Sequence, residues 1–369
     1  MGFAIASFAR SFFFPPAAAP LRREPNRRWK RTSAASSLLH LKVADVINET
    51  PDTRTFVFEE EGLAYRAGQH LTLVVNLDGQ THRRCYSFSS SPAAAGRSSI
   101  TVKRVEGGLL SNWLHDRVRT GDVLRATPAS GRFTLEPDAS ESRHIVMVAG
   151  GVGITPLISM AETTLRAEPG SRVTLLYGSR SEDEIIFRTR LERLAEEFGE
   201  RFDLRFAVDE GAASWPGLTG KLGGERVVAT LGHAGPAQWF ICGPEAMMQS
   251  VVAALGRAGV ADERIHLERF QYAESSTARM PQAPASLVFR ASGMTISAPV
   301  GTTILEAAEQ AGIALPSSCR MGGCGACKVK IDGRVASAEP NCLTDQERAE
   351  GYALACCSWG DGRVELRDF

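Results

Sequence analysis

The chain has 369 residues, which exceeds what one ordinary hydrophobic core accommodates and fits two or three domains. Hydrophobic residues make up 43% and charged residues 23%, a composition typical of a globular protein. Lys plus Arg equals Asp plus Glu at 42 each, so no net charge indicates a nucleic-acid partner. No apolar run reaches the roughly 18 residues that a membrane-spanning helix needs, so we expect no transmembrane segment.

Residues 1–37 differ in composition from the rest of the chain. They contain several Arg and Lys residues but a single acid, Glu24, and an apolar patch at Phe12 to Phe14 that Pro15 interrupts. This composition is typical of a disordered tail or an upstream start codon. An organelle transit peptide, which is rich in Arg and Ser and poor in acids, is the alternative. We therefore expect a cytoplasmic protein, with organellar targeting by residues 1–37 as the second interpretation.

Residues 38–140 contain short runs of alternating apolar and polar residues separated by Gly and Pro. Such runs predict several antiparallel strands in a barrel or sandwich, here with one short helix near residues 110–117. The expected strands include residues 55–58, 70–74, 99–102 and 123–126.

From residue 141 to residue 270 the pattern changes to strands that alternate with helices. That alternation predicts a parallel sheet with helices on its faces. The expected strands are residues 145–148, 173–177, 203–208 and 238–242, and the expected helices are 155–165, 183–198 and 244–257.

Residues 271–285 contain Ser and Pro and little apolar content, which favours a flexible linker. Residues 286–369 then form a compact module. The segments 287–289 and 294–296 predict a hairpin, and Thr303 with Glu306 predicts a capping box at the start of a helix that ends at Gly312. The whole chain is therefore expected to combine a β-barrel domain, an α/β domain and a smaller α+β domain.

Six of the eight cysteines lie in this last module, which favours a metal or redox site in a reducing compartment over a disulfide scaffold. Cys319, Cys324 and Cys327 have the C-x4-C-x2-C spacing of a [2Fe–2S] site, and the fourth thiolate ligand follows as Cys356 or Cys357. Glycines between the first three cysteines permit a loop to wrap closely around a cluster. A zinc site is the alternative, but zinc ligands usually come as two knuckles and no second knuckle follows.

The module resembles a plant-type ferredoxin domain over residues 286–369, which implies a β-grasp fold. In such domains the last ligand ends a Tyr-x-Leu-x-Cys sequence, which residues 352–356 match. The resemblance implies that Cys356 is the fourth ligand, that Cys357 is its buried neighbour, and that Cys342 binds no metal.

Residues 84–87, here called the flavin motif, read Arg-Cys-Tyr-Ser and taken alone describe an ordinary strand. Together with a ferredoxin-like module they resemble the R-x-Y-S signature of the ferredoxin–NADP reductase superfamily. The resemblance implies that Arg84 pairs with a flavin phosphate, a use suited to the planar donor fork of arginine. It also implies that Tyr86 packs on the isoalloxazine ring and that Ser87 acts as a catalytic residue by donating a hydrogen bond near flavin N5.

A second flavin sequence is Gly108-Leu-Leu-Ser111, which resembles the helix start that holds the flavin pyrophosphate in this superfamily. Helix starts attract anions through their free amides and the helix dipole. The diphosphate implied by Ser111 favours FAD over FMN.

The glycine-rich turn from Gly150 to Pro156 resembles the first of the superfamily's two nicotinamide turns. The resemblance places Gly151, Gly153, Thr155 and Pro156 against the nucleotide. A generic strand-to-helix turn is the alternative, with Thr155 as the N-cap and Pro156 as the first helical residue.

Cys242-Gly243-Pro244 resembles the second nicotinamide turn, whose cysteine lies near nicotinamide C4; a lone buried cysteine is the alternative interpretation. Ser179 and Arg180 end the second strand of the α/β region, where the adenosine ribose is expected. An arginine there can receive a 2′-phosphate, so these two residues slightly favour NADPH over NADH.

The order of the motifs resembles the reductase components of bacterial oxygenases, with residues 240–244 and 266–270 as the most telling matches. In such proteins the end of the second segment, here Glu268 or Phe270, is expected beside the flavin. The resemblance implies that NAD(P)H reduces FAD, that single electrons pass to the [2Fe–2S] cluster, and that the ferredoxin module docks on an acceptor oxygenase or another redox protein. The protein would supply orientation and exclude side reactions. The alternatives are the same electron path serving a desaturase or a hybrid-cluster protein, and a redox-sensing module.

Overall fold

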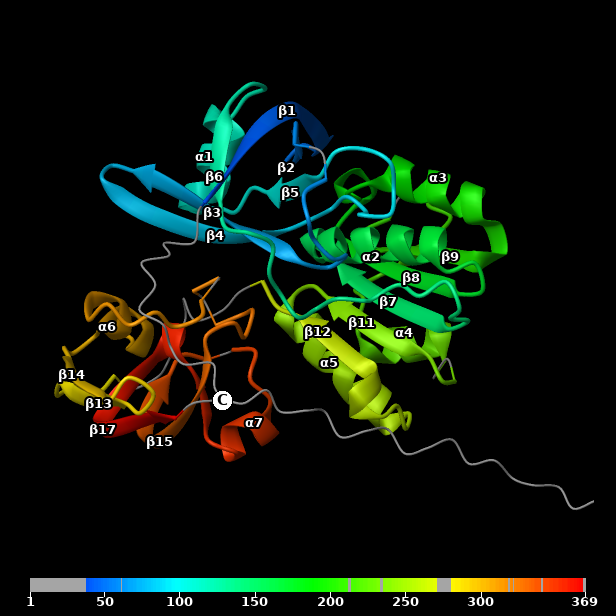
Figure 1. Ribbon diagram of the computed structural model, residues 1–369. Helices are drawn as coiled ribbons and strands as arrows, with labels where there is room; N and C mark the ends of the chain where they lie inside the picture. Colours follow the sequence, from blue (N-terminus) through cyan, green and yellow to red (C-terminus); the bar gives the residue numbers. More distant parts are fainter. Residues whose placement is uncertain are drawn as a thin grey trace, which may run out of the picture.

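The structure is a computed structural model that describes residues 38–367 apart from 61, 212–213, 233–234, 271–279, 318, 321 and 340. The predicted extension 1–37 and most of the predicted linker 271–285 lie outside the described residues. Three sheets occupy separate regions of the molecule, with the first above the other two in Figure 1. Within the described part of the chain, none of the helices has the length and apolar content needed to cross a membrane.

The first sheet is an antiparallel barrel, which confirms the predicted fold class of this region. The sheet has six strands in the order β4-β3-β6-β1-β2-β5, and a bridge from Phe88 to Ile100 brings the end of β4 to β5 and so closes the sheet on itself. One short helix, α1 (Leu109–Arg117), lies between β5 and β6. The strands are β1 (Leu39–Thr50), β2 (Thr53–Phe58), β3 (His70–Leu77), β4 (Gln80–Ser87), β5 (Ser99–Lys103) and β6 (Val123–Ala126).

The second sheet is parallel throughout, as the alternation of strands and helices predicted. Its six strands have the order β10-β9-β8-β7-β11-β12. Helices α2 and α3 cover one face and α4 and α5 cover the other, because their apolar side chains belong to two separate cores. The strands are β7 (His144–Gly150), β8 (Arg172–Ser179), β9 (Phe202–Val208), β10 (Leu218–Thr219), β11 (Gln238–Cys242) and β12 (Ile265–Glu268), and the helices are α2 (Ile154–Ala167), α3 (Arg188–Phe198), α4 (Gly224–Leu231) and α5 (Glu245–Arg257).

Two local predictions in this region were wrong. The helix expected over 183–198 begins only at Arg188, because residues 185–187 are buried in the core and Phe187 adopts a left-handed backbone with φ 61°. Thr155 is not an N-cap. Helix α2 begins at Ile154, and the Thr155 hydroxyl donates to the Val152 carbonyl at 3.0 Å.

The third sheet is mixed and has the order β14-β13-β17-β15-β16, which confirms the predicted β-grasp domain. Its helix α6 (Ile304–Gln310) opens with the predicted capping box, in which Thr303 accepts from the Glu306 amide. A second capping box, Thr344 with Glu347, opens α7 (Asp345–Ala349) and was not predicted. The strands are β13 (Ala285–Phe289), β14 (Met294–Ala298), β15 (Lys328–Ser337), β16 (Tyr352–Leu354) and β17 (Ser358–Arg367).

The core of the parallel sheet extends to segments beside the barrel strands, while those strands have a core of their own. Phe133 and Leu135, which follow the last barrel strand, are buried among α2 side chains. The Phe133 ring meets Phe240 of β11 edge to face, with 5.6 Å between the ring centroids. Ser91 Oγ and Thr163 Oγ1 add a hydrogen bond of 2.7 Å between the two units. Close packing of this kind fixes one unit against the other.

The third sheet meets the barrel through polar side chains. Arg132 Nη1, in the segment that follows β6, lies 3.7 Å from Glu347 Oε1 at the start of α7. The same Glu347 oxygen accepts from Lys328 Nζ at 2.6 Å. These contacts bring the segment that carries the first three clustered cysteines towards strand β4.

Candidate redox site

Four of the clustered thiols form two pairs. Cys319 is the neighbour that most raises the pKa of Cys324, and Cys356 is the neighbour that most raises the pKa of Cys327. The Cys324 amide also donates to Cys319 Sγ at 3.4 Å. Among the described residues, no three His, Cys, Asp or Glu side chains surround a position for a single ion. Two pairs suit two irons that each take two thiolates, as in a [2Fe–2S] cluster.

The electrostatics of the thiols also fit a metal cluster. The neighbouring thiol first, and burial second, raise the pKa of both Cys324 and Cys327. Burial and the neighbouring thiols therefore disfavour the thiolate forms of Cys324 and Cys327. Iron ions supply the missing positive charge, since a metal deprotonates the thiols that coordinate it.

Cys357 and Cys342 lie beside the four thiols in different ways. A Cβ on Gly322, whose φ is +79°, would lie 2.9 Å from Cys357 Sγ, so Cys357 packs against the loop backbone. The Cys357 side chain hydrogen-bonds to Cys356. Cys342 is partly buried and is held through its amide, which donates to the Gly322 carbonyl at 2.9 Å. The pairing of Cys356 with Cys327 therefore favours Cys356 as the fourth ligand.

The flavin motif lies at the end of β4, an edge strand of the first sheet as ordered by its hydrogen bonds. Ser87 is buried, Arg84 is exposed and Tyr86 is partly buried. Burial raises the pKa of Tyr86, so its phenol stays neutral. Interaction with Cys319 first, and burial second, raise the pKa of Cys85, whose sulfur lies 3.2 Å from Thr72 Oγ1. The sequence did not indicate that the flavin motif lies close to residues 319–327, which we call the cluster loop.

The predicted pyrophosphate helix is present, but its serine is occupied. Helix α1 has Gly108 as its N-cap, without a side-chain cap. Ser111 Oγ accepts from the Val105 amide at 3.2 Å and lies 3.5 Å from the Gly108 carbonyl. The side chain of Ser111 thus closes the preceding turn, and the backbone amides at the start of α1 are the better donors for a diphosphate.

The two nicotinamide turns meet where the strand order of the parallel sheet reverses. Strand β7 lies between β8 and β11, so the chain leaves β7 on one side and returns on the other. Ligands of open parallel sheets bind at the carboxyl ends of the strands at such a switch point. The turn after β7 holds Gly151 and Gly153 and leads into Thr155 and Pro156 in the first turn of α2, and the turn after β11 holds Gly243 and Pro244.

Glycine is required at these turns because they are in contact. A Cβ on Gly153 would lie 2.2 Å from the Cys242 carbonyl oxygen, and one on Gly243 would lie 2.9 Å from the Gly150 amide nitrogen. Gly151 has a φ of +53°, in the left-handed region that favours glycine. The structure therefore brings the two predicted turns together.

Cys242 and Glu268 are both buried at the ends of neighbouring strands, and they are paired in register. Burial first, and then Glu268, raise the pKa of Cys242 well above its ordinary value. Burial, followed by the charge of Cys319, raises the pKa of Glu268 to about 8. Both groups are therefore neutral near pH 7, and Cys242 is not a thiolate nucleophile. Phe270, by contrast, is exposed.

At the end of β8, Ser179 is buried and Arg180 is exposed. Arg180 Nη2 lies 2.8 Å from Glu184 Oε2 and 3.9 Å from Asp52 Oδ2 of the barrel. Sequence spacing could have indicated Glu184, which follows Arg180 by four residues. Asp52 could not have been found, because it comes from a different sheet.

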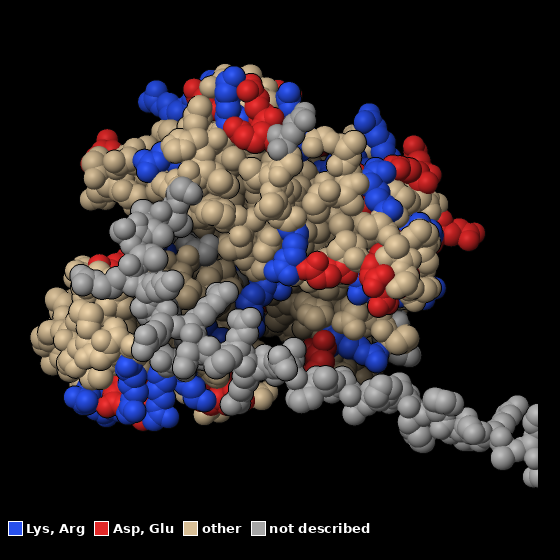
Figure 2. All heavy atoms as spheres, in the orientation of Figure 1, with Lys and Arg blue, Asp and Glu red and all other residues tan. Residues whose placement is uncertain are grey.

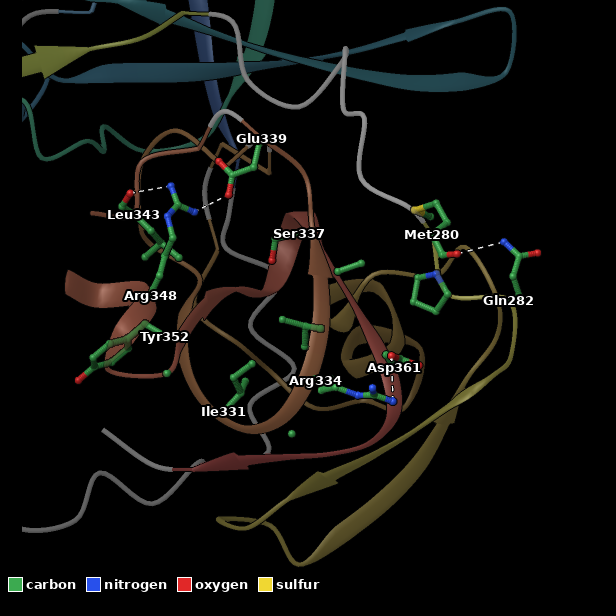
Figure 3. A pocket seen from close by; sticks show the side chains of 15 residues that line it. Met280, Gln282, Ile331, Arg334, Ser337, Glu339, Leu343, Arg348, Tyr352 and Asp361 are labelled. Atoms are coloured by element: carbon green, nitrogen blue, oxygen red, sulfur yellow. Dashed lines mark hydrogen bonds and ion pairs between the residues drawn. The ribbon is translucent and has the colours of Figure 1, made fainter. Parts of the chain in front are cut away.

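Figure 3 shows a hollow of about 800 Å³ in the third unit, between residues 280–282 and strand β15. Arg348 lies on its wall and donates to Leu343 O at 2.9 Å, and Arg334 pairs with Asp361 at 3.4 Å. None of the predicted site residues lines it. The face in Figure 2 carries both acidic and basic side chains.

A closed antiparallel barrel, a parallel sheet with a switch-point crevice and a β-grasp unit with paired thiols define a flavin and iron–sulfur reductase. Three family models agree with this class. The oxidoreductase FAD-binding domain matches residues 40–135, the oxidoreductase NAD-binding domain matches 147–253, and the 2Fe-2S iron–sulfur cluster binding domain matches 289–359.

Similar proteins cover nearly the whole described chain. It is 33% identical over 332 residues to a component of 1,2-phenylacetyl-CoA epoxidase from Escherichia coli (strain K12), with 86% of this chain and 93% of that protein covered. It is 34% identical over 344 residues to the ferredoxin reductase component of 3-ketosteroid-9-alpha-monooxygenase from Mycolicibacterium smegmatis, covering 87% and 94%. The solved structure of phthalate dioxygenase reductase matches with a TM-score of 0.60 and 26% identity, covering 90% and 98%.

The chain therefore belongs to the family of flavin and iron–sulfur reductase components of oxygenases. It is an NAD(P)H-dependent oxidoreductase with FAD and [2Fe–2S] domains, as the sequence motifs predicted.

Proposed function

We propose that this reductase takes a hydride from NADPH and delivers the two electrons, one at a time, to a partner oxygenase. The observation that carries the proposal is the convergence of three sites on Cys319. Cys319 is among the groups that raise the pKa of Cys85 in the flavin motif and the pKa of the buried Glu268. Glu268 is paired in register with Cys242 of the second nicotinamide turn. Sites held this close need no diffusing carrier between them.

When bound, FAD accepts a hydride and releases electrons singly, and a [2Fe–2S] cluster carries one electron at a time. The protein's part is to hold these groups and exclude water. Cys319, Cys324, Cys327 and Cys356 are the proposed ligands of the cluster, because their thiols form two pairs.

For the flavin, we assign Arg84 to a phosphate, Tyr86 to the ring and Ser87 to a hydrogen bond at N5. Support comes from the position of the motif at the end of β4 and from the partly buried Tyr86, whose pKa is raised by burial. The amides from Gly108 to Ser111 are assigned to the diphosphate of FAD, since the hydroxyl of Ser111 is already used.

For the nicotinamide, we assign the crevice between the turn at Gly151 and Gly153 and the turn at Cys242. As a neutral, buried thiol, Cys242 can shape the pocket for the ring but cannot attack it. Thr155 and Pro156 extend the same wall of the crevice at the start of α2. Orientation of the two reacting rings is the main catalytic contribution.

We assign the 2′-phosphate of NADPH to Ser179 and Arg180. Arg180 is exposed at the carboxyl end of β8, where the adenosine ribose of a dinucleotide lies in such sheets. Its pairing with Glu184 is a surface contact that a phosphate can replace, because a doubly charged phosphate is the stronger acceptor.

We infer three domains, over residues 38–140, 141–270 and 286–369. A linker at 271–285 joins the second domain to the third. The clustered cysteines are free thiols, which persist in a reducing compartment. We therefore favour a location in the cytoplasm. We expect no nucleic-acid partner, because acidic and basic residues balance.

Anaerobic titration of the holoenzyme with NADPH and with NADH tests the proposal. We expect loss of the visible flavin absorption, followed by the electron paramagnetic resonance (EPR) signal of a reduced cluster. Ser87→Ala should slow flavin reduction while FAD stays bound. A flavin that stays oxidised with both nucleotides would contradict the electron path. The acceptor is tested by co-purification with the full chain. An oxygenase that co-purifies and turns over with NADPH only in the presence of this reductase supports an oxygenase partner. Co-purification of a desaturase would replace that assignment.

A further inference from the structure

The chain that leaves the flavin motif is held by side chains of the α/β domain. Residues 89–91, which we call the serine segment, follow the motif closely and are all serine. Helix α2 contacts two of them: Ser159 Oγ donates to the Ser90 carbonyl at 2.6 Å, and Thr163 Oγ1 lies 2.7 Å from Ser91 Oγ. Ser159 and Thr163 are both buried. The serine segment therefore lies against α2 through hydrogen bonds of buried side chains.

Arg190 of α3 makes a third contact with the serine segment. Its Nη1 donates to the Ser89 carbonyl at 2.9 Å, and its Nη2 lies 2.5 Å from Glu162 Oε2 on α2. Ser89 is fully buried, and the Glu162 side chain is only 8% exposed. Hydrogen bonds that involve an ionised donor or acceptor are the strong ones in proteins. Arg190 thus joins the serine segment to two helices at once.

Helix α2 also begins at the nicotinamide crevice. The first nicotinamide turn, Gly151 to Gly153, leads directly into α2 at Ile154, and Ser159 lies between one and two helical turns further along. On the flavin side, the serine segment begins two residues after Ser87, which we assign to flavin N5. One helix therefore connects the turn assigned to the nicotinamide with the strand assigned to the flavin.

This connection bears on hydride transfer, because that reaction depends steeply on the placement of the reacting atoms. A misplacement of about 1 Å can cost about a hundredfold in rate. A contact that fixes the flavin strand relative to α2 therefore acts on the rate of hydride transfer, and not on the binding of either cofactor.

We propose that Arg190 is a positioning residue for hydride transfer, which holds the serine segment against α2 and so aligns the flavin motif with the nicotinamide crevice. Arg190 exchanges no proton or electron in this role. The inference rests on the proposed assignments of Ser87 to the flavin and of the two glycine-containing turns to the nicotinamide.

Anaerobic stopped-flow reduction of the flavin in Arg190→Met tests the inference, with the nucleotide that reduces the wild type faster. Methionine keeps much of the apolar stem but removes both hydrogen bonds. At saturating nucleotide we expect the limiting rate to fall about five- to fiftyfold, as a displacement of up to about 1 Å implies. The FAD content and the dissociation constant of the nucleotide should stay close to the wild-type values. The charge-transfer absorption of the stacked rings should weaken as well, which a loss of stability alone would not produce.

Arg166→Met is the matched control. Arg166 Nη2 lies 2.9 Å from the same Glu162 carboxylate, and its Nη1 lies 2.8 Å from Glu197 Oε1, so these contacts lie within the α/β domain. This variant should keep the wild-type rate of flavin reduction. An unchanged limiting rate in Arg190→Met, or an equal fall in Arg166→Met, would overturn the proposal.

Two further variants complete the test. Arg190→Lys retains one charged donor and should recover part of the rate. Ser159→Ala removes only the bond to Ser90 and should lower the limiting rate while FAD stays bound. If Arg190→Met loses FAD, Ser159→Ala decides, and a wild-type rate in that variant would overturn the proposal. Failure of the proposed function looks different, because the wild-type flavin would then stay oxidised with both nucleotides, and the inference would fall with it.

Discussion

Replacing Arg180 by alanine tests the assignment of NADPH most directly. If Arg180 binds the 2′-phosphate, the variant loses charge-assisted hydrogen bonds that are each worth about 1.5–3 kcal/mol. Part of this is offset in the wild type, because Arg180 must first leave Glu184, which lies 2.8 Å away at the surface. Exposed ion pairs contribute up to about 1 kcal/mol. The net loss is therefore about 1–2 kcal/mol, or about 5- to 30-fold in binding.

The assay is anaerobic stopped-flow reduction of the flavin at varied NADPH and NADH. We expect the kcat/KM for NADPH to fall by this factor in Arg180→Ala and that for NADH to stay close to the wild-type value, because NADH has no 2′-phosphate. Glu184→Gln should act in the opposite direction, since it frees Arg180. Arg205→Ala, which removes an exposed arginine paired with Asp203 at 2.7 Å, is the control. A ratio of the two kcat/KM values that is the same in Arg180→Ala and wild type would refute the reasoning.

Three other tests probe the cluster, the nicotinamide crevice and the fold. Cys356→Ser should abolish the EPR signal of the cluster while Cys357→Ser keeps it, and the reverse pattern would reassign the fourth ligand. Gly153→Ala places a methyl group against the Cys242 backbone, so we expect about 1–3 kcal/mol of destabilisation and weaker NADPH binding. A melting temperature and an NADPH affinity equal to those of the wild type would refute the close contact between Gly153 and Cys242. Glu168→Gln should cost about 1–3 kcal/mol, since Glu168 is fully buried and 2.5 Å from Arg143. Burial opposes ionisation of Glu168, but hydrogen bonds from Arg143, Ser171 and Asp138 hold its pKa below the ordinary value of 4.5. The stability that Glu168 contributes is therefore present above pH 4.5 and is lost as the pH falls through the folded-state pKa. A difference in unfolding free energy that is independent of pH would contradict this account.

The sequence predicted what depends on local pattern. Strand and helix alternation gave the two sheet classes, and the Thr303 capping box was read correctly. The Thr344 capping box has the same four-residue signature and could have been found in the same way. The late start of helix α3 after Phe187 could not be predicted, because the amphipathic pattern continues through residues 185–187 and does not show that they are buried in the core.

Contacts between segments far apart in the chain could not be predicted from the sequence, for a different reason. Cys85 and Cys319 are separated by more than half of the chain, and neither has a neighbouring residue that signals the other. The pairing of Asp52 with Arg180 likewise depends on how the barrel packs against the parallel sheet. Motifs identify which groups bind a cofactor, but only packing determines which sites meet.

The two interfaces of the molecule differ in a way that matches the two kinds of transfer. Hydride transfer needs the reacting atoms at contact distance, and the core of the parallel sheet extends to Phe133 and Leu135 beside the barrel. A single electron can cross a longer gap, and the third unit meets the barrel through polar side chains such as Arg132 and Glu347, with side chains 62% and 18% exposed. Polar interfaces between domains are typically open to relative motion. We infer that the chain fixes the geometry of the hydride step, and we propose that the ferredoxin unit separates from the barrel to deliver electrons to a second protein.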